Sequence, residues 1–183
     1  VIADNCAEYA NLIFNNSENY SGSTLVLGVL FFAFQIYCDF SGYSTMARGV
    51  ARFIGFELMV NFRFPYFSLT PSEFWRRWHI SLSTWLRDYL YVGLGGNRGG
   101  RLLTYRNLML TMLLGGLWHG AAYTYIVWGA IHGVALAVER ALGLQDNRGA
   151  GRFTGIRLAW FAVTQAVVLC AWVFFRSDTF GNA

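Results

Sequence analysis

The feature that most constrains the fold is residues 107–138, a stretch of 32 residues without a single Asp, Glu, Lys or Arg. As one straight helix, this stretch would be about 48 Å long, whereas the hydrocarbon core of a bilayer is only about 30 Å thick. Arginines lie at both of its ends, which places both ends on the cytoplasmic side of a membrane. The pattern therefore predicts two short helices that enter the membrane and return, with a turn near Gly120.

The composition also indicates a membrane protein. Hydrophobic residues make up 55% of the chain and charged residues 13%, about half of the ~25% that is usual in soluble domains. The net charge is +4, but the arginines are scattered between apolar stretches instead of forming one basic tract, so a nucleic-acid partner is not expected. We expect an all-α, multi-pass helical membrane protein with short, tilted or re-entrant helices, which forms a single membrane-embedded core over residues 1–183.

Two more apolar stretches, residues 24–38 and 158–175, are expected to cross the membrane. The first is about 15 residues long, short of the ~20 that a span needs, and residues 39–44 can extend it. Asp39 would then lie in the membrane or at its edge, where an acid is a candidate functional residue. The alternative is a structural carboxylate bonded to nearby hydroxyls or to Arg48. Residues 1–23 are expected to be a loop or a frayed short helix, residues 53–69 to lie along the membrane or re-enter it, and residues 145–157 to form a polar loop.

Residues 70–91 carry the pattern of one amphipathic helix. Thr70 suits the N-cap, Pro71 suits the first helical position, and Glu73 completes a capping box with Thr70. An aromatic face and an arginine face follow, which is typical of a helix at a membrane interface. His79 falls on the aromatic face, where an imidazole needs a partner or a function. The aromatic face comprises Trp75, Trp78, His79, Leu82, Leu86 and Tyr89, and the opposite face includes Arg76, Arg77, Arg87 and Asp88.

His119 is the stronger candidate for chemistry. It lies in segment 116–120, where glycines at both ends permit close approach of helices, and at the expected membrane-level turn. A neutral imidazole can take a proton from a hydroxyl and so activate that hydroxyl to attack an acyl carbonyl. His132, which has helix on both sides, is interpreted as a packing residue.

Other known site patterns are absent from the sequence. No metal site is expected, because no pair of histidines or cysteines has the spacing of metal ligands. The glycine-rich segment 93–101 does not have the spacing of a dinucleotide-binding loop. It either binds a phosphate through arginines and backbone amides or is a plain flexible turn.

Five segments together resemble the membrane-bound O-acyltransferase family and, more narrowly, its bacterial branch of alginate O-acetylation membrane proteins. They are residues 35–44, 74–83, 85–91, 95–100 and 115–121, in that order. The resemblance implies a multi-pass helical enzyme that passes an acyl group across the bacterial inner membrane. It implies that His119 is the essential catalytic residue, that His79 assists it, and that a tunnel joins the cytoplasmic donor side to the extracytoplasmic acceptor side. Family members are longer, so this sequence is expected to be a fragment.

The expected activity is O-acetylation of an exopolysaccharide such as alginate, with His119 as general base or transient acyl carrier and His79 orienting the donor. No bound cofactor is expected. The donor is expected to be acetyl-CoA or a related activated acetyl group from the cytoplasm, and the partners are membrane lipid and an extracytoplasmic acetyl-accepting protein. Contacts with the substrates are expected from Trp78, Trp118, Asp39, Arg76, Arg77 and Arg98.

Alternatives to this activity stay open. A close variant is D-alanyl transfer to teichoic acid. A helical transporter without acyl-transfer chemistry would use Asp39 and His119 as residues of its pathway. A fragment without catalytic activity of its own is the third alternative.

Overall fold

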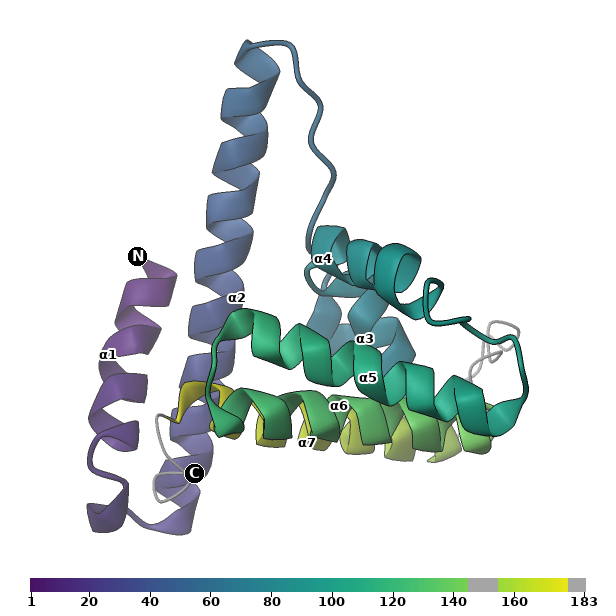
Figure 1. Cartoon of the computed structure of the whole chain (residues 1–183). Helices are drawn as coiled ribbons and strands as arrows, with labels where there is room; N and C mark the ends of the chain where they lie inside the picture. The colour runs from purple at the N-terminus through teal and green to yellow at the C-terminus, as the bar shows by residue number, and fades with distance from the viewer. Residues whose placement is uncertain (145–154, 178–183) are drawn as a thin grey trace.

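The computed structural model describes residues 1–144 and 155–177, and every regular element within them is helical (Figure 1). The helices are α1 (Ile2–Phe14), α2 (Gly22–Phe53), α3 (Pro71–Arg77), α4 (Ile80–Trp85), α5 (Arg101–His119), α6 (Tyr123–Ala141) and α7 (Gly155–Arg176). Two short 3-10 turns, Ser17–Asn19 and Pro65–Phe67, and a π-helical turn, Leu86–Tyr91, lie between them. The prediction of an all-α fold is confirmed for this part of the chain.

The helices form two groups that run in different directions. Figure 1 shows α1 beside α2, while α5, α6 and α7 lie side by side and run across the direction of α2. Within the described part of the chain, two helical segments are apolar and long enough to cross a membrane, Gly22–Phe53 and Arg157–Arg176. Because α2 and α7 point in different directions, both cannot stand along the membrane normal, which agrees with the predicted tilted helices.

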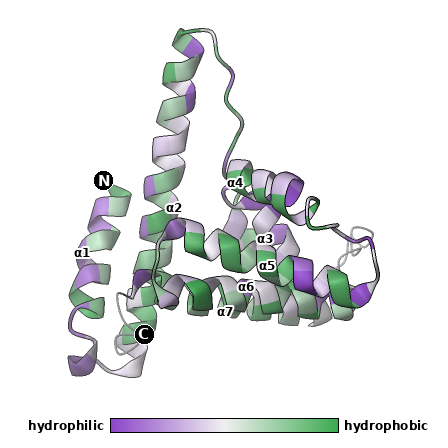
Figure 2. Ribbon diagram, in the orientation of Figure 1, coloured by the Kyte–Doolittle hydropathy of each residue, from purple (hydrophilic) through white to green (hydrophobic). Residues whose placement is uncertain are grey.

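Large apolar side chains face outward on several helices. Val26, Phe34 and Val50 on α2 and Val163 on α7 are all about half exposed or more. Figure 2 shows hydrophobic residues along α2, α5 and α6. Extensive exposed apolar surface marks contact with lipid or with other protein, so these surfaces fit a membrane environment.

The helical hairpin predicted from residues 107–138 is confirmed. α5 and α6 pack against each other and are joined by a turn at residues 120–122. Two glycines make the close approach possible. A Cβ atom on Gly116 would lie 2.2 Å from the carbonyl oxygen of Tyr125, and one on Gly129 would lie 2.4 Å from that of Met112. Any larger residue at either position would push the two helices apart.

Other sequence-based boundaries are corrected by the structure. Residues 70–91 are not one helix, because the chain breaks at Trp78 and His79 between α3 and α4. Of the two expectations for residues 1–23, the short helix is confirmed and the loop is wrong for most of the segment, since α1 is a regular helix of 13 residues. The polar residues 39–44 continue α2 as helix, and α2 runs on to Phe53. Most of the expected loop 145–157 lies outside the described residues.

The predicted start of α3 is confirmed with one change. The Thr70 side chain accepts a hydrogen bond from the Glu73 N–H at 3.3 Å, as an N-cap does. The Glu73 carboxylate, however, accepts from the N–H of Leu69 at 2.7 Å instead of that of Thr70. The helix therefore begins at Pro71, as expected. The Glu73 side chain bonds to the backbone of Leu69, one residue before the Thr70 that a capping box would use.

α3 lies at the centre of the core, and contacts of Phe74 and Ser72 hold it in place. Phe74 is only 1% exposed and stacks on the rings of Trp78 and His132, with centroid distances of 5.6 and 6.0 Å. At the start of α3, the Ser72 N–H donates to the buried carboxylate of Glu139 on α6 at 2.8 Å, and the Ser72 hydroxyl bonds to the same carboxylate. These contacts fix α3 against α6 and so determine where the break after it lies.

Candidate active site

Two histidines meet at one pocket with a volume of about 260 Å³. Every helix from α2 to α7 contributes to its wall, together with the break between α3 and α4. The lining residues are Ile36, Phe40, Trp75, Trp78, His79, Leu82, Trp118, His119, Trp128, Trp172 and Phe175. We call this cavity the histidine pocket. The fold thus brings together His79 and His119, which are 40 residues apart in the sequence.

His79 lies in an unusual backbone conformation. Its φ of 42° and ψ of 57° belong to the left-handed region, which residues other than glycine seldom adopt. Asn61, in the segment between α2 and α3, stabilises this conformation. The Asn61 carbonyl oxygen accepts from the Ile80 N–H at 3.0 Å, and its side-chain oxygen accepts from the Ser81 N–H at 3.0 Å. These are the first two N–H groups of α4, so Asn61 caps this helix in place of the His79 side chain.

The same segment ties the break to α2 and α3. The Asn61 side-chain amide donates to the Ser44 hydroxyl on α2 at 3.1 Å. The Arg63 N–H donates to the carbonyl oxygen of Arg77, the last residue of α3, at 3.0 Å. The position of His79 is therefore set by hydrogen bonds from a distant part of the sequence.

The surroundings of His79 keep its imidazole neutral. Its ring lies edge-on to Phe40 at a centroid distance of 4.6 Å and 6.4 Å from the ring of Trp118. Burial lowers the pKa of His79 to about 4, and the nearby His119 contributes to the same shift by charge repulsion. A neutral imidazole at pH 7 can donate one hydrogen bond and accept another. His79 therefore suits the orientation of a neutral group better than the attraction of an anion.

His119 is the last residue of α5, at the turn that leads into α6. Its ring lies among three other rings, with centroid distances of 5.0 Å to Trp118, 5.2 Å to Trp128 and 5.0 Å to Phe175. The side chain is partly exposed at the histidine pocket, so it is accessible to a ligand there. Gly120 is required beside it, since a Cβ atom at this position would lie 2.6 Å from the Tyr125 ring.

The two tryptophans that precede the histidines have different positions. Trp78 is 5% exposed and forms a fixed wall of the histidine pocket, with its ring 5.0 Å from that of Trp172. Trp118 is 62% exposed and also lines the pocket, with its ring 6.4 Å from that of His79 and 5.0 Å from that of His119. Trp118 is therefore better placed than Trp78 to contact a substrate as it enters.

The pocket is suited to proton transfer in a weakly polar environment. Among the described residues, no carboxylate lines it, and no group of three or more His, Cys, Asp or Glu could hold a metal ion. The polar side-chain atoms of its described lining residues are ring nitrogens of histidine and tryptophan. An imidazole in such a site can accept the proton of a hydroxyl, while nearby N–H groups stabilise negative charge on an oxygen.

Asp39 does not lie at the histidine pocket. Its side chain is exposed on α2 and is absent from the described lining residues. Among the described residues, Asp39 forms no ion pair with Arg48, whose guanidinium donates to the carbonyl oxygen of Leu58 at 3.1 Å. The expected position of Asp39 in the membrane or at its edge stays a prediction.

The three arginines expected to contact an anionic donor lie apart from one another. Arg76 is exposed and lines a separate pocket beside the histidine pocket. Arg77 is engaged in an ion pair with Glu73 at 2.5 Å. Arg98 is exposed in the glycine-rich segment, which is a series of turns held by a hydrogen bond from the Asn107 side chain to the Gly96 carbonyl oxygen at 3.1 Å.

Sequence reasoning missed two residues that position the site. Asn61 lies in an aromatic-rich stretch and gives no local signal of its role as a cap for α4. Glu139 directly precedes Arg140 and has the pattern of a charged helix end, yet its side chain is fully buried against Ser72. Both act through contacts with residues far away in the sequence, which a local pattern does not reveal.

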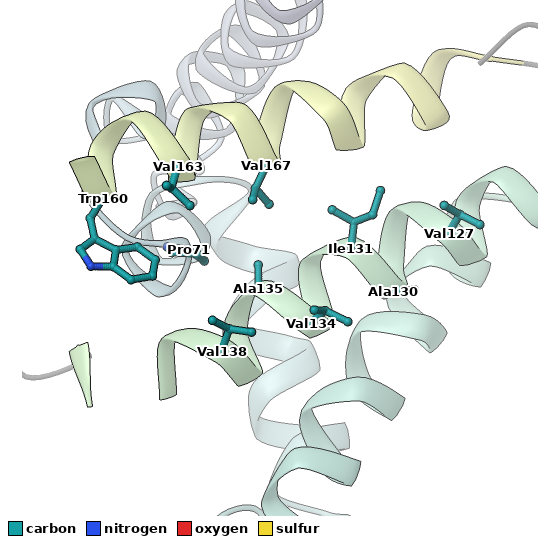
Figure 3. Close-up of a pocket in the computed structure, with 10 residues that line it drawn as sticks. All are labelled: Pro71, Val127, Ala130, Ile131, Val134, Ala135, Val138, Trp160, Val163 and Val167. Carbon is teal, nitrogen blue, oxygen red and sulfur yellow. The ribbon is translucent and has the colours of Figure 1, made fainter. Parts of the chain in front are cut away.

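A further pocket, about 460 Å³ in volume, lies between α6 and α7. Figure 3 shows the side chains of Ile131, Val134, Val163 and Val167 around it, with Trp160 at one end. Its described lining contains no titratable side chain. This apolar groove therefore offers no chemistry, and the histidine pocket is the better candidate active site.

Comparison with known proteins agrees with the geometry. A model of the membrane-bound O-acyltransferase family matches residues 13–175. The chain is 55% identical over 177 residues, 97% of its length, to the "Probable alginate O-acetylase AlgI" of Pseudomonas putida. It is 44% identical over 183 residues to the peptidoglycan O-acetyltransferase of Helicobacter pylori. It is 35% identical over 123 residues, 63% of its length, to the teichoic acid D-alanyltransferase of Streptococcus thermophilus.

The chain spans about a third of the length of these curated relatives, with shares of 35%, 34% and 30% in the same order. The family model nevertheless covers nearly all of this chain, including both histidines and every helix that lines their pocket. The apolar helices and outward-facing apolar side chains fit a protein that is embedded in a membrane. The chain therefore belongs to the membrane-bound O-acyltransferase family.

Proposed function

We propose that the protein to which this chain belongs transfers an acetyl group to a hydroxyl in the O-acetylation of an exopolysaccharide, with alginate as the first candidate polymer. The observation that carries the proposal is the histidine pocket, where His79 and His119 face one cavity. The relatives named for alginate and peptidoglycan O-acetylation, at 55% and 44% identity, support acetyl transfer to a polysaccharide.

In the proposed reaction, His119 acts as general base. The acceptor hydroxyl gives its proton to the His119 imidazole while its oxygen attacks the carbonyl carbon of an acetyl thioester. The carbon–sulfur bond then breaks, and the thiolate takes the proton back from His119. The products are an O-acetyl ester and a free thiol, and the imidazole returns to its neutral form. His79 orients the donor with a hydrogen bond, and the exposed ring of Trp118 contacts it.

The remaining parts of the proposal concern substrates and location. The donor is acetyl-CoA or a related activated acetyl group from the cytoplasm, and the acceptor on the other side is an acetyl-accepting protein of the polysaccharide pathway. The protein is a multi-pass protein of the bacterial inner membrane, and residues 1–183 are part of one membrane-embedded core. The arginines at both ends of the α5–α6 hairpin support a cytoplasmic position for these ends.

D-Alanyl transfer to teichoic acid is the second candidate. It would use the same pocket, and the teichoic acid D-alanyltransferase of Streptococcus thermophilus supports it at 35% identity over 63% of the chain. Its lower identity and shorter match favour acetyl transfer. A transporter would instead move a solute without forming an ester, so flux without covalent transfer in reconstituted vesicles would support that alternative.

The test uses membranes that contain the full-length protein. Radiolabelled acetyl-CoA is supplied, and label in the polymer and in acetylated protein is counted for the wild type and for His119→Ala. We expect His119→Ala to lower transfer by about 10²-fold or more at equal protein level, the usual range for a general base. Tyr123→Phe is the matched control, since Tyr123 lies near the turn but is 76% exposed. Retained transfer by His119→Ala at normal expression would remove the mechanism.

A further inference from the structure

The apolar groove between α6 and α7 follows one face of α6 for about three turns. Its α6 residues recur every three or four positions, as residues on one helix face do, and they extend over about 16 Å at 1.5 Å per residue. Figure 3 shows Val138 and Trp160 at one end of the groove and Val127 at the other. The α6 residues of the lining are Val127, Ala130, Ile131, Val134, Ala135 and Val138.

The groove is too narrow to take a helix. Its volume of about 460 Å³, spread over that length, corresponds to a cross-section of about 28 Å², whereas a helix about 10 Å across has about 80 Å². A further helix could therefore lie over the groove but could not enter it. A single extended hydrocarbon chain is narrow enough to lie inside, along the line between α6 and α7.

The groove is open to its surroundings and apolar along its length. Val134, Val138 and Val163 line it and are 51%, 45% and 47% exposed. No charged side chain belongs to its described lining. Exposed apolar surface of this kind marks contact with a lipid or a protein, and a narrow groove gains many close contacts with a chain that fills it.

The Val138 end of the groove has the features of a membrane–water interface. Trp160 lies at this end, and tryptophan is enriched where a membrane meets water. Arg157 precedes Trp160 by three residues and so lies on the same side of α7, near the start of the helix. A guanidinium group binds phosphate well, and its five N–H groups allow it to do so beside another partner.

We propose that the apolar groove binds one acyl chain of an anionic membrane phospholipid, with the phosphate of the headgroup at Arg157. Cytoplasmic leaflets are rich in anionic lipid, and the arginines place this end of α6 and α7 on the cytoplasmic side. The inference goes beyond the proposed acyl transfer, because the described linings of the apolar groove and the histidine pocket have no residue in common. The lipid is a bound component of the protein and not a substrate.

A lipid chain in this place would hold α7 against the start of α3. Pro71, the first residue of α3, belongs to the lining of the groove. The Thr164 hydroxyl on α7 donates to the Leu69 carbonyl oxygen at 3.0 Å, and the Gln165 amide donates to that of Ser68 at 3.1 Å. These bonds join α7 to the chain that precedes α3. Bound lipid should therefore raise the unfolding temperature of the protein.

Lipid binding by the full-length protein tests this site. Phosphatidylglycerol and phosphatidylcholine are titrated into delipidated protein in detergent, and bound lipid is measured by native mass spectrometry. We expect Ala130→Leu/Ala135→Leu, which fills the groove, to raise the Kd for phosphatidylglycerol at least tenfold. Ala159→Leu is the matched control, because Ala159 is exposed on α7 and is absent from the described lining. Arg157→Gln should weaken binding of phosphatidylglycerol at least fivefold and leave that of phosphatidylcholine unchanged.

Thermal unfolding is the second measurement. Phosphatidylglycerol should raise the unfolding temperature of the wild type and of Ala159→Leu, but not that of Ala130→Leu/Ala135→Leu. His119→Ala should bind phosphatidylglycerol like the wild type, so the result does not depend on the proposed catalysis. An unchanged Kd for phosphatidylglycerol in Ala130→Leu/Ala135→Leu would overturn the proposal.

Other occupants of the groove predict different results. If another helix of the full-length protein covers the groove, the wild type will show no saturable binding of phosphatidylglycerol. If a second copy of the protein covers it, Ala130→Leu/Ala135→Leu will convert a dimer into a monomer without changing lipid binding. Either result would contradict the lipid site.

Discussion

At the scale of single residues, Asn61 decides where His79 lies. Its side chain bonds to the Ser81 N–H and to the Ser44 hydroxyl, and its carbonyl oxygen bonds to the Ile80 N–H. Asn61 touches none of the reacting groups in the proposed mechanism and does not line the histidine pocket as described. It is a positioning residue, which acts by holding the left-handed conformation of His79.

Loss of the Asn61 side chain should therefore lower the rate more than it affects donor binding. We expect Asn61→Ala to lower kcat by about 10²-fold, because a displacement of about 1 Å in a catalytic group has an effect of that size. The KM for the donor should change little, since Asn61 does not line the histidine pocket as described. Asn61→Asp keeps an acceptor for the Ser81 N–H and should lose less activity.

The measurement is steady-state acetyl transfer in membranes at equal protein level. Asn19→Ala serves as the control, because Asn19 is exposed in the short turn after α1. A wild-type kcat for Asn61→Ala would show that Asn61 does not position His79. An increase in KM alone would contradict the account as well, because it would assign Asn61 to donor binding.

At the scale of secondary-structure elements, the α5–α6 hairpin carries His119 and depends on two glycines. Gly116 and Gly129 leave no room for a Cβ atom against the backbone of the facing helix. The backbone cannot move away as a flexible side chain can, so even a methyl group requires the helices to separate. His119 follows Gly116 by three residues and would shift with the end of α5.

We expect Gly116→Ala and Gly129→Ala each to destabilise the protein by about 1–3 kcal/mol, the usual effect of overpacking. Gly49→Ala is the matched control in α2, because no heavy atom lies within 4 Å of its Cβ position. This control should be neutral or slightly stabilising, since alanine favours helix. Thermal unfolding in detergent measures whether Gly116→Ala and Gly129→Ala unfold at lower temperatures than Gly49→Ala. Equal unfolding temperatures for the three variants would show that the two helices do not need glycine at their contact.

The hairpin could be predicted from the sequence, whereas the break at His79 could not. The hairpin follows from a long uncharged stretch between arginines, which is a property of residues 107–138 themselves. The break is imposed by Asn61 and Arg63, which bond to residues 14 to 20 positions further along the chain. Residues 70–91 keep a continuous amphipathic pattern through the break, so local periodicity predicted one helix where the structure has two and a π-helical turn.

At the scale of the whole molecule, the candidate site is assembled from every helix between α2 and α7. The resemblance to a family identified His79 and His119, but only the fold shows that both face one cavity. It also separates the arginines: Arg76 lines a pocket beside the site, while Arg77 is paired with Glu73. The packing of the helices determines where these side chains lie, and the spacing of residues in the sequence does not reveal it.

The central claim is that His79 and His119 act together in one pocket, and a double-mutant cycle tests it most directly. Acetyl transfer by the full-length protein is measured for His79→Ala, His119→Ala and the double variant, with an assay that resolves residual rates ~10⁴-fold below the wild type. Residues that act as a unit have non-additive effects. We predict that the rate of acetyl transfer by the double variant lies within about twofold of the rate of His119→Ala. A loss in the double variant equal to the product of the two single losses would contradict the account.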